Sequence, residues 1–301
     1  MAQKTEVRVG RRKLQLSNLD KVFYPATGMT KGDVIAYYRE IAPVLLPHLR
    51  NRFVTLKRYP NGVDGKFFYE KECPSHRPEW VATAPMVRKK DKKAVNYCLL
   101  NDLPSLVWSA NLANLELHTS LACAKDFYRP TALVFDLDPG PPAAVLQCAE
   151  VALLVRAILE EAGLEAFAKT SGSKGIQLFA PLNTAVTYDD TKPFAHQLAL
   201  RLQEEHRDLV LSSQSRAERE GKVLVDWSQN DDHKTTASVY SLRAKERPTA
   251  STPVTWDEVE AALKKRRPER LSFEASEVLA RVEQHGDLFE PVRKLKQKLP
   301  R

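Results

Sequence analysis

The hydrophobic and polar positions of the chain predict short strands that alternate with helices. Strands are predicted where apolar residues alternate with polar ones or run together, at 7–16, 53–60, 131–138, 165–170, 176–182, 209–213 and 222–228. Helices are predicted where apolar residues recur three and four apart, after Thr30, at 103–117, before Gly163, near 190–206 and after Thr255. Thr30 to Asp33 and Thr255 to Glu258 have the spacing of a capping box, which marks a helix start.

Several segments are expected to lie outside these elements. RKKDKK at 88–93 is expected to be an exposed loop or hairpin tip, SRAEREGK at 215–222 a charged loop, and the tail KLKQKLPR a frayed end. A turn-rich NGVDGK precedes the aromatic run Phe67, Phe68 and Tyr69. Core packing is one interpretation of these three rings, and for Phe67 we prefer it.

The composition is that of a globular protein with an excess of basic residues. Of 301 residues, 43% are hydrophobic and 28% charged, and the formal net charge is +8. An excess of Lys and Arg suits a polyanionic partner because neutralised phosphates release counterions, although many basic proteins bind no nucleic acid. No stretch approaches the roughly 20 apolar residues of a membrane span, and no apolar run follows the basic start. We therefore expect a cytoplasmic protein with no membrane contact.

The cysteines show no sign of a metal or redox motif. Cys73, Cys98, Cys123 and Cys148 form neither a CxxC pair nor a cluster with zinc-type spacing. We expect reduced, mostly buried thiols, as in a reducing compartment.

Two carboxylates end the predicted strand TALVFDLD. Side chains two apart in a strand point the same way, so Asp136 and Asp138 share a face, and Leu133, Phe135 and Leu137 face the opposite side. Two such carboxylates repel each other unless something positive lies between them, and Mg²⁺ or Mn²⁺ is the usual partner. A solvated strand end with ordinary ion pairs is the alternative.

A third carboxylate strengthens the metal hypothesis. Asp226 lies in the apolar strand KVLVDWS, flanked by Val225 and Trp227, and a buried acid there needs a partner. Three carboxylates from two strands can bind two ions roughly 3.5–4 Å apart, the arrangement used in phosphoryl transfer. A structural ion pair stays open for Asp226 taken alone.

A small turn suited to anions lies between two predicted strands. In SGSKG at 171–175, the glycines allow close approach of backbone N–H groups, the hydroxyls can donate, and Lys174 adds charge. The spacing is not that of a P-loop, and a plain hairpin turn is an equal alternative.

Seven motifs, in this order, resemble one family: the polymerase domains of the archaeo-eukaryotic primase superfamily found with bacterial ligase D. They are DKVFYPATGMTK (20–31), LKRYPNGVD (56–64), LELH (115–118), LVFDLDPG (133–140), TSGSKG (170–175), VDWSQN (225–230) and YSLRA (240–244). The resemblance covers nearly the whole chain and has no ligase or nuclease part, so we expect a stand-alone member.

The resemblance implies an α/β fold in which an RRM-like antiparallel catalytic sheet packs against a second α/β lobe. It implies one catalytic domain over 1–301: a part that binds DNA and its 5′-phosphate at about 1–125, a metal- and nucleotide-binding sheet at about 130–245, and C-terminal helices at about 254–298. It implies gap filling or end extension in DNA repair by a nucleotidyltransferase that uses NTP or dNTP and two Mn²⁺ or Mg²⁺ ions. It implies a bacterial, nucleoid-associated protein, with Ku and a DNA ligase as partners.

By the same resemblance, the metal ligands are Asp136, Asp138 and Asp226. The residues that match nucleotide-binding positions are Lys57, His118, Ser171, Ser173, Lys174, Gln229 and Arg243. Those that match DNA-binding positions are Lys21 and Lys31 for a 5′-phosphate, Phe68 and Tyr69 for template bases, with Lys71 beside them, and Arg219 in a mobile loop.

Two features depart from the family pattern. Gln177 stands where members commonly have His, so the grip on the triphosphate or its pH dependence is expected to differ. The stretch between His118 and Asp136 looks shorter than in ligase D, which favours gaps over end joining.

Two other functions compete with a polymerase. One is a non-catalytic module that bridges 5′-phosphorylated DNA ends, which would have no reason to keep three clustered acids. The other is a metal-dependent glycosyltransferase of the DxD type, which would not need the Lys21 and Lys31 pair.

Overall fold

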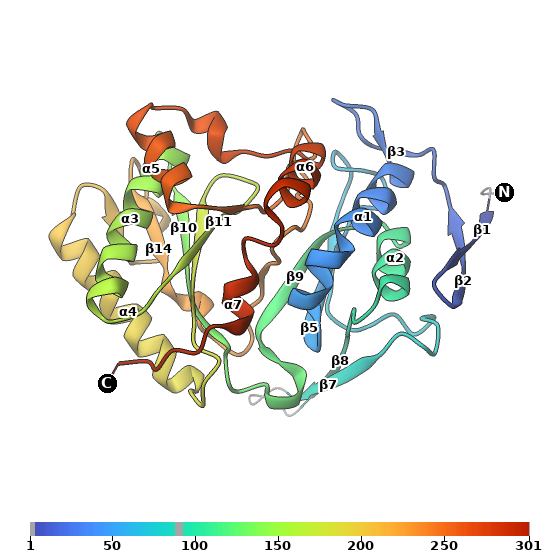
Figure 1. Cartoon of the computed structure of the whole chain (residues 1–301), viewed down its shortest axis with the longest axis horizontal. Helices are drawn as coiled ribbons and strands as arrows, with labels where there is room; N and C mark the ends of the chain where they lie inside the picture. Colours follow the sequence, from blue (N-terminus) through green and yellow to red (C-terminus); the bar gives the residue numbers. More distant parts are fainter. Residues whose placement is uncertain (1–3, 88–92, 301) are drawn as a thin grey trace. The chain divides into compact units, whose positions relative to one another are not determined.

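The computed structural model describes residues 4–87 and 93–300, which form two compact units (Figure 1). The first unit contains the chain up to Lys125 together with Thr235–Ala250 and Glu274–Gly286. The second contains Asp126–Lys234, Ser251–Phe273 and the chain from Asp287 onward. Segment 235–250, which we had grouped with the metal-binding sheet, thus belongs to the first unit. A single catalytic domain over 1–301 stays a prediction.

The first unit is built on a six-stranded antiparallel sheet. Its order is β15-β9-β5-β8-β7, with β6 also paired to β5. The strands are β5 (Arg52–Arg58), β6 (Phe68–Glu70), β7 (Thr83–Val87), β8 (Ala94–Cys98), β9 (Asn114–Cys123) and β15 (Thr236–Ala237). The helices of this unit are α1 (Lys31–Leu49), α2 (Leu103–Asn111) and α6 (Ala275–His285). Two hairpins complete it: β1 (Lys4–Val9) with β2 (Arg12–Ser17), and β3 (Val22–Tyr24) with β4 (Met29–Thr30).

Helix α1 begins where the capping-box spacing predicts. The Thr30 side chain accepts from the backbone N–H of Asp33, and the Asp33 carboxylate accepts from the backbone N–H of Thr30. The predicted inner face is buried, since Val34, Tyr38, Ile41 and Leu45 are each at most 1% exposed. The second capping box, at Thr255, likewise starts helix α5 (Trp256–Lys264).

The predicted helix at 103–117 is wrong in its second half. Helix α2 ends at Asn111, the backbone turns at Ala113 with φ of 63°, and the chain continues as β9. In β9, Leu115, Leu117 and Leu121 alternate with polar Asn114, Glu116, His118 and Ser120, which is the pattern of a strand. Only residues 114–117 of this strand fall within the predicted helix, and so short a stretch is not enough to distinguish the two periods.

The strand expected at 7–16 is two strands. Gly10, with φ of 57°, makes the turn between β1 and β2, and Val9 pairs with Arg12. Val7 and Val9 occupy odd positions and Leu14 and Leu16 even ones, with Gly10–Lys13 between them, so the turn corresponds to a change of phase in the alternation.

The second unit is built on another six-stranded, mainly antiparallel sheet, of order β13-β14-β10-β12-β11-β16. Its strands are β10 (Ala132–Pro139), β11 (Phe167–Thr170), β12 (Ile176–Pro181), β13 (Val210–Leu211), β14 (Val223–Asp226) and β16 (Pro253–Val254). Its helices are α3 (Val145–Glu161), α4 (Tyr188–Glu205), α5 (Trp256–Lys264) and α7 (Glu290–Lys294). The strands and helices predicted from 131 to 228 are therefore present.

One face of this sheet carries the hydrophobic core. Leu133, Phe135 and Leu137 of β10 are fully buried and cluster with apolar residues of α3, α4 and α5, which gather on one side of the strands (Figure 1). Strand alternation then places Asp136 and Asp138 on the opposite face, as predicted.

Two expectations about charged segments have different outcomes. The tail is not frayed, because the Gln297 side chain donates to the carbonyls of Glu165 and Pro181 and accepts from the Glu165 N–H, and Leu299 packs against the core. The basic segment 88–93 lies, except for Lys93, outside the described residues.

The expectation of four reduced cysteines is wrong for two of them. Cys73 and Cys98 form a disulfide that links the segment after β6 to the end of β8, whereas Cys123 and Cys148 are free. Their sequence separation gave no signal, because the pairing depends on the strands that bring them together.

No helix in the described ranges is long and apolar enough to cross a membrane.

Reduction of this disulfide is expected to destabilise the protein. The bond closes a loop of 25 residues, which corresponds to about 3 kcal/mol in the chain-entropy model and roughly 5–10 °C in melting temperature. The melting temperature of the wild type should fall by this amount with reductant, and that of Cys73→Ser should not respond. Cys123→Ser is the matched control and should respond like the wild type; an unchanged wild-type melting temperature would contradict the role of the bond.

Candidate active site

A row of polar side chains crosses the second sheet on the face opposite its core. Asp226 of β14 lies directly opposite Asp136 of β10, Asp136 opposite Gln177 of β12, and Gln177 opposite Lys169 of β11. Directly opposed residues point to the same face, with Cβ atoms roughly 4.5–5.5 Å apart. The row therefore places two carboxylates, an amide and an ammonium side by side.

The Asp136 carboxyl has a strongly perturbed pKa. Its pKa is raised to about 6, mainly because burial disfavours the charged form, and the Asp226 carboxylate adds to this effect. A hydrogen bond from Gln177 and the positive charge of Lys169 act in the opposite direction. The two aspartates thus form a like-charge pair on one face of the sheet.

Asp226 is held by donors from its own neighbourhood. Its Oδ1 accepts from the backbone N–H of Ser228 at 2.9 Å, from the Ser228 hydroxyl at 2.6 Å and from Gln214 Nε2 at 2.9 Å. Its Oδ2 accepts from Gln229 Nε2 at 2.9 Å. Gln229 Oε1 is buried without a hydrogen-bond partner among the described residues. It is therefore one more oxygen next to Asp226 that can coordinate a metal ion.

Asp138 is half exposed and pairs with Arg219. Arg219 Nη1 lies 3.3 Å from Asp138 Oδ2, so the loop at 215–222 reaches the carboxylates. Gly140 makes this approach feasible, since a Cβ there would lie 1.8 Å from the Arg219 carbonyl oxygen. The oxygens of Asp136, Asp138 and Asp226 do not all lie within 4.8 Å of one another.

The SGSKG turn lies against the end of β10. A Cβ on Gly175 would lie 1.9 Å from the Leu137 carbonyl oxygen, so only glycine fits there. Ser171 is buried, and its hydroxyl oxygen accepts from the backbone N–H groups of Ser173 and Gly175. Ser171 thus stabilises the turn, whereas Ser173 and Lys174 are exposed at its tip.

Lys169 is fully buried and was not among the predicted site residues. Its ammonium donates to Gln177 Oε1 and, at 2.7 Å, to the Ser251 hydroxyl. The Gln177 amide is thereby oriented with its NH₂ group available to Asp136. A lysine in the middle of an apolar strand, as in FAKT, was the sequence signal that could have revealed it.

Predicted nucleotide-site residues of the first unit gather around Glu116. The Glu116 side chain is 2% exposed and lies 3.0 Å from Lys57 Nζ, 2.9 Å from His118 Nε2 and 3.1 Å from Arg243 Nε. It also accepts from the Tyr59 hydroxyl at 3.2 Å and from the Ala244 backbone N–H at 3.1 Å.

The charges around Glu116 dominate its ionisation. Burial alone would raise the pKa of this carboxyl, but the His118 hydrogen bond and the charges of Arg243 and Lys57 hold it well below its ordinary value. Burial also lowers the pKa of His118, against the effect of Glu116. Sequence reasoning missed Glu116 because a helix at 103–117 does not place it beside His118, whereas residues two apart in β9 share a face.

The aromatic run on β6 is exposed. Phe68 and Tyr69 are 43% and 56% exposed, and Phe67, which we expected in the core, is 51% exposed. Lys57 Nζ lies 4.6 Å from the Phe67 ring centroid and 5.6 Å from that of Tyr69. Lys71 is exposed and lines a surface hollow next to Tyr69.

Lys21 and Lys31 differ in exposure. Lys21 lines a surface hollow of about 610 Å³, and its ammonium donates to Pro60 O and Asn61 Oδ1. Lys31 is buried and donates to the Ser17 carbonyl at 2.6 Å and to Asn111 Oδ1 at 2.8 Å. The pKa of Lys31 is lowered to about 8 because burial disfavours the ammonium and Lys21 and Arg58 repel it.

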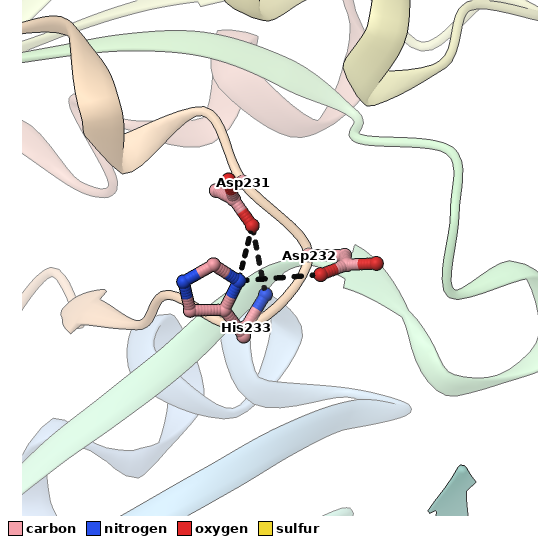
Figure 2. Close-up of side chains that lie close together, drawn as sticks. All are labelled: Asp231, Asp232 and His233. Carbon is pink, nitrogen blue, oxygen red and sulfur yellow. Dashed lines mark hydrogen bonds and ion pairs between the residues drawn. The ribbon is translucent and has the colours of Figure 1, made fainter. Parts of the chain in front are cut away.

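Another acidic cluster was not anticipated from the sequence. Figure 2 shows the carboxylates of Asp231 and Asp232 on the same side of the His233 ring, both directed at its Nδ1, in the loop after Asn230. Their ligand atoms lie within 4.8 Å of one another, yet Asp231 already pairs with Lys192 and His233. We regard it as an ion-pair cluster and assign it no further role.

Comparison with known proteins identifies related chains. Residues 30–289 match the family model "LigD, primase-polymerase domain". The chain is 39% identical over 282 residues to "Multifunctional non-homologous end joining protein LigD" of Mycolicibacterium smegmatis, covering 93% of this chain and 36% of that protein. It is 32% identical over 252 residues to "Bifunctional non-homologous end joining protein LigD" of Bacillus subtilis, covering 83% and 40%. The chain thus spans well under half the length of these relatives.

A solved structure is also similar. The polymerase domain from Mycobacterium tuberculosis ligase D in complex with DNA matches with a TM-score of 0.86 and 38% identity, covering 94% of this chain and 99% of that one. The predicted archaeo-eukaryotic primase-like fold is thereby confirmed.

Loss of the Glu116 charge is expected to cost stability at neutral pH. Glu116→Gln leaves the Lys57 and Arg243 cations and the His118 ring around a neutral amide, and breaking a buried pair costs about 3–5 kcal/mol. Because the pKa of Glu116 is depressed when folded, its contribution is present above the unfolded value near 4.3 and lost as pH falls. Urea unfolding should show a large deficit at pH 7 that shrinks below about pH 4.

Glu6→Gln is the matched control for this measurement. Glu6 pairs with Lys13 on the surface of the same unit, where an ion pair contributes about 1 kcal/mol or less. Equal losses for the two variants would mean that Glu116 is not a buried electrostatic centre.

Proposed function

Because the chain belongs to the primase-polymerase family of ligase D, a family of DNA-directed nucleotidyltransferases, we propose that it fills short gaps and extends ends in DNA. The observation that carries this proposal is the direct cross-strand pair Asp136 and Asp226 beside the SGSKG turn. A polymerase requires such clustered carboxylates, whereas a non-catalytic end-bridging module does not. The family also argues against a glycosyltransferase.

Family membership implies metal dependence, and the donor set fits Mn²⁺ or Mg²⁺. Asp136, Asp138 and Asp226 would hold two ions, and Gln229 Oε1 is a buried oxygen without a partner among the described residues. When bound, such ions lower the pKa of an attacking hydroxyl and offset charge on the phosphates.

The remaining residues bind and orient the substrates. Ser173 and Lys174, exposed at the tip of a turn braced by Ser171, are proposed to donate to the triphosphate of an NTP or dNTP. Lys57, His118 and Arg243, fixed by Glu116, are proposed to contact the nucleotide as well. The primer 3′-hydroxyl then attacks the α-phosphate in line and pyrophosphate leaves.

DNA binding is proposed from the solved relative, which holds DNA, and from the basic surface. Phe68 and Tyr69 are exposed and available to stack on template bases, with Lys71 beside them. We propose that Lys21 contacts a downstream 5′-phosphate directly and that buried Lys31 supplies positive potential behind it. Ku and a separate DNA ligase stay predicted partners, and a bacterial nucleoid location stays a prediction.

The central test is primer extension on gapped DNA with Mn²⁺ or Mg²⁺ and either nucleotide type. Asp226→Asn should reduce extension by roughly 10³-fold or more, because loss of a metal ligand removes several kcal/mol of transition-state stabilisation. DNA binding, followed by fluorescence anisotropy, should change less than about twofold. Asp232→Asn, six residues away in the ion-pair cluster, is the matched control; equal effects of the two variants would overturn the assignment of Asp226.

Stimulation by a downstream 5′-phosphate should depend on pH. The Lys31 ammonium is lost as pH rises through about 8, whereas the phosphate is fully charged above pH 7. The ratio of extension rates with and without the 5′-phosphate should fall between pH 7 and pH 9, with a midpoint at or somewhat above 8 because bound phosphate favours the ammonium. Lys31→Gln should show a smaller ratio with no such fall; a constant wild-type ratio would contradict the role of Lys31.

A further inference from the structure

The amino-terminal part of the chain holds much of its positive charge. Residues 4–31 contain seven Lys or Arg and two Asp or Glu, which gives five of the eight net charges of the protein in about a tenth of its length. Five of these basic residues belong to the β1–β2 hairpin and two are Lys21 and Lys31. The family match starts at residue 30, so the hairpin lies outside the part shared with that family model.

The two faces of the hairpin differ in character. Pairing of Val7 with Leu14 and of Thr5 with Leu16 places apolar residues on one face, where Leu14 and Leu16 are buried. The other face, called here the ribbon face, consists of the pairs Lys4–Ser17, Glu6–Gln15 and Arg8–Lys13 and of the tip; its basic residues are Lys4, Arg8, Arg11 and Lys13, all exposed. Within the hairpin, Glu6 is the acidic residue of this face, and it pairs with Lys13.

The hairpin is fixed to the lysine pair and to α2, beside which it lies (Figure 1). Lys31 Nζ donates to the Ser17 carbonyl at the end of β2, and the Asn111 side chain binds the Gln15 carbonyl and the Ser17 N–H, each at 3.1 Å. Thr5 of β1 lines the same hollow as Lys21. The β1–β2 hairpin, whose ribbon face begins at the neighbouring Lys4, therefore starts next to the residue that we place on the 5′-phosphate.

The charge pattern of the hairpin is costly without an anionic partner. Arg8 lies directly opposite Lys13, and like charges in that position destabilise a strand pair. Glu6 offsets one charge of the ribbon face and leaves the others exposed. A phosphate backbone would offset them all, because it presents one charge for each 1.7 Å of duplex axis.

We propose that the ribbon face binds the backbone of the DNA duplex downstream of the 5′-phosphate. This inference rests on the proposed function, since it places the duplex beyond the gap along β1 and β2. Strands of six residues extend roughly 20 Å, which corresponds to about six base pairs at 3.4 Å per pair. The contact is independent of sequence, as expected for Lys and Arg on phosphates.

The test compares two downstream duplexes, of 3 and 12 base pairs, each capped by a DNA hairpin and carrying the same gap and 5′-phosphate. Dissociation constants are measured by fluorescence anisotropy over a range of KCl concentrations. The ribbon variant is Arg8→Gln, Arg11→Gln and Lys13→Gln in the full chain. The matched control is Lys264→Gln, Lys265→Gln and Arg266→Gln, three exposed residues at the end of α5 that give the same change in net charge.

On the 12-base-pair substrate, the plot of log association constant against log salt concentration should be less steep for the ribbon variant than for the wild type, by roughly 2–3 in the magnitude of the slope. Each lost phosphate contact reduces this magnitude by about 0.9. On the 3-base-pair substrate the wild type and the ribbon variant should have slopes that differ by less than about 1. The control variant should follow the wild type on both.

Either of two results would overturn the inference: equal slopes for the ribbon and control variants on the long duplex, or an equal loss by the ribbon variant on both duplexes. A different result would contradict the proposed function: no primer extension by the wild type on any DNA substrate. As a control for folding, the circular dichroism spectrum and the melting temperature of the ribbon variant are compared with those of the wild type, and both are expected to be unchanged.

Discussion

The structure of the second unit depends on one electrostatic constraint, the two carboxylates that oppose each other on β10 and β14. Like charges directly opposite across strands disfavour pairing, and burial of Asp136 adds to the cost. The surrounding residues offset it: Lys169 acts through Gln177, Ser228 and Gln229 donate to Asp226, and Arg219 pairs with Asp138. The neighbouring groups thus keep charges together that would otherwise separate.

The first unit shows the opposite arrangement, with one carboxylate between two cationic side chains and a histidine ring. Glu116 holds Lys57, His118 and Arg243 so that each has a fixed geometry. Side chains with many rotatable bonds lose much entropy when a ligand orders them. A buried acid that orders them during folding removes that cost from the binding step, which is how preorganised sites gain affinity.

The sequence was sufficient for the features that local rules control. The capping boxes at Thr30 and Thr255, the strand ending in Asp136 and Asp138, and the opposed faces of that strand follow from spacing alone. It was insufficient where contacts between distant parts of the chain determine the structure. The start of β9 was predicted to be helical, Cys73 and Cys98 were predicted to be free thiols, and Phe67 was predicted to lie in the core. Glu116 and Lys169 were missed because their partners come from strands distant in sequence. The motif resemblance, rather than periodicity, gave most of the candidate site.

Gly140 and Gly175 determine where this protein can vary in evolution. Each sits where a methyl group would collide with a backbone carbonyl, that of Arg219 or of Leu137. Selection can therefore retain only glycine at these two positions, however the substrate changes. Ser173, two residues before Gly175, is exposed and under no such steric constraint, so the affinity for the triphosphate can change there while the two glycines keep the neighbouring loops against the strand.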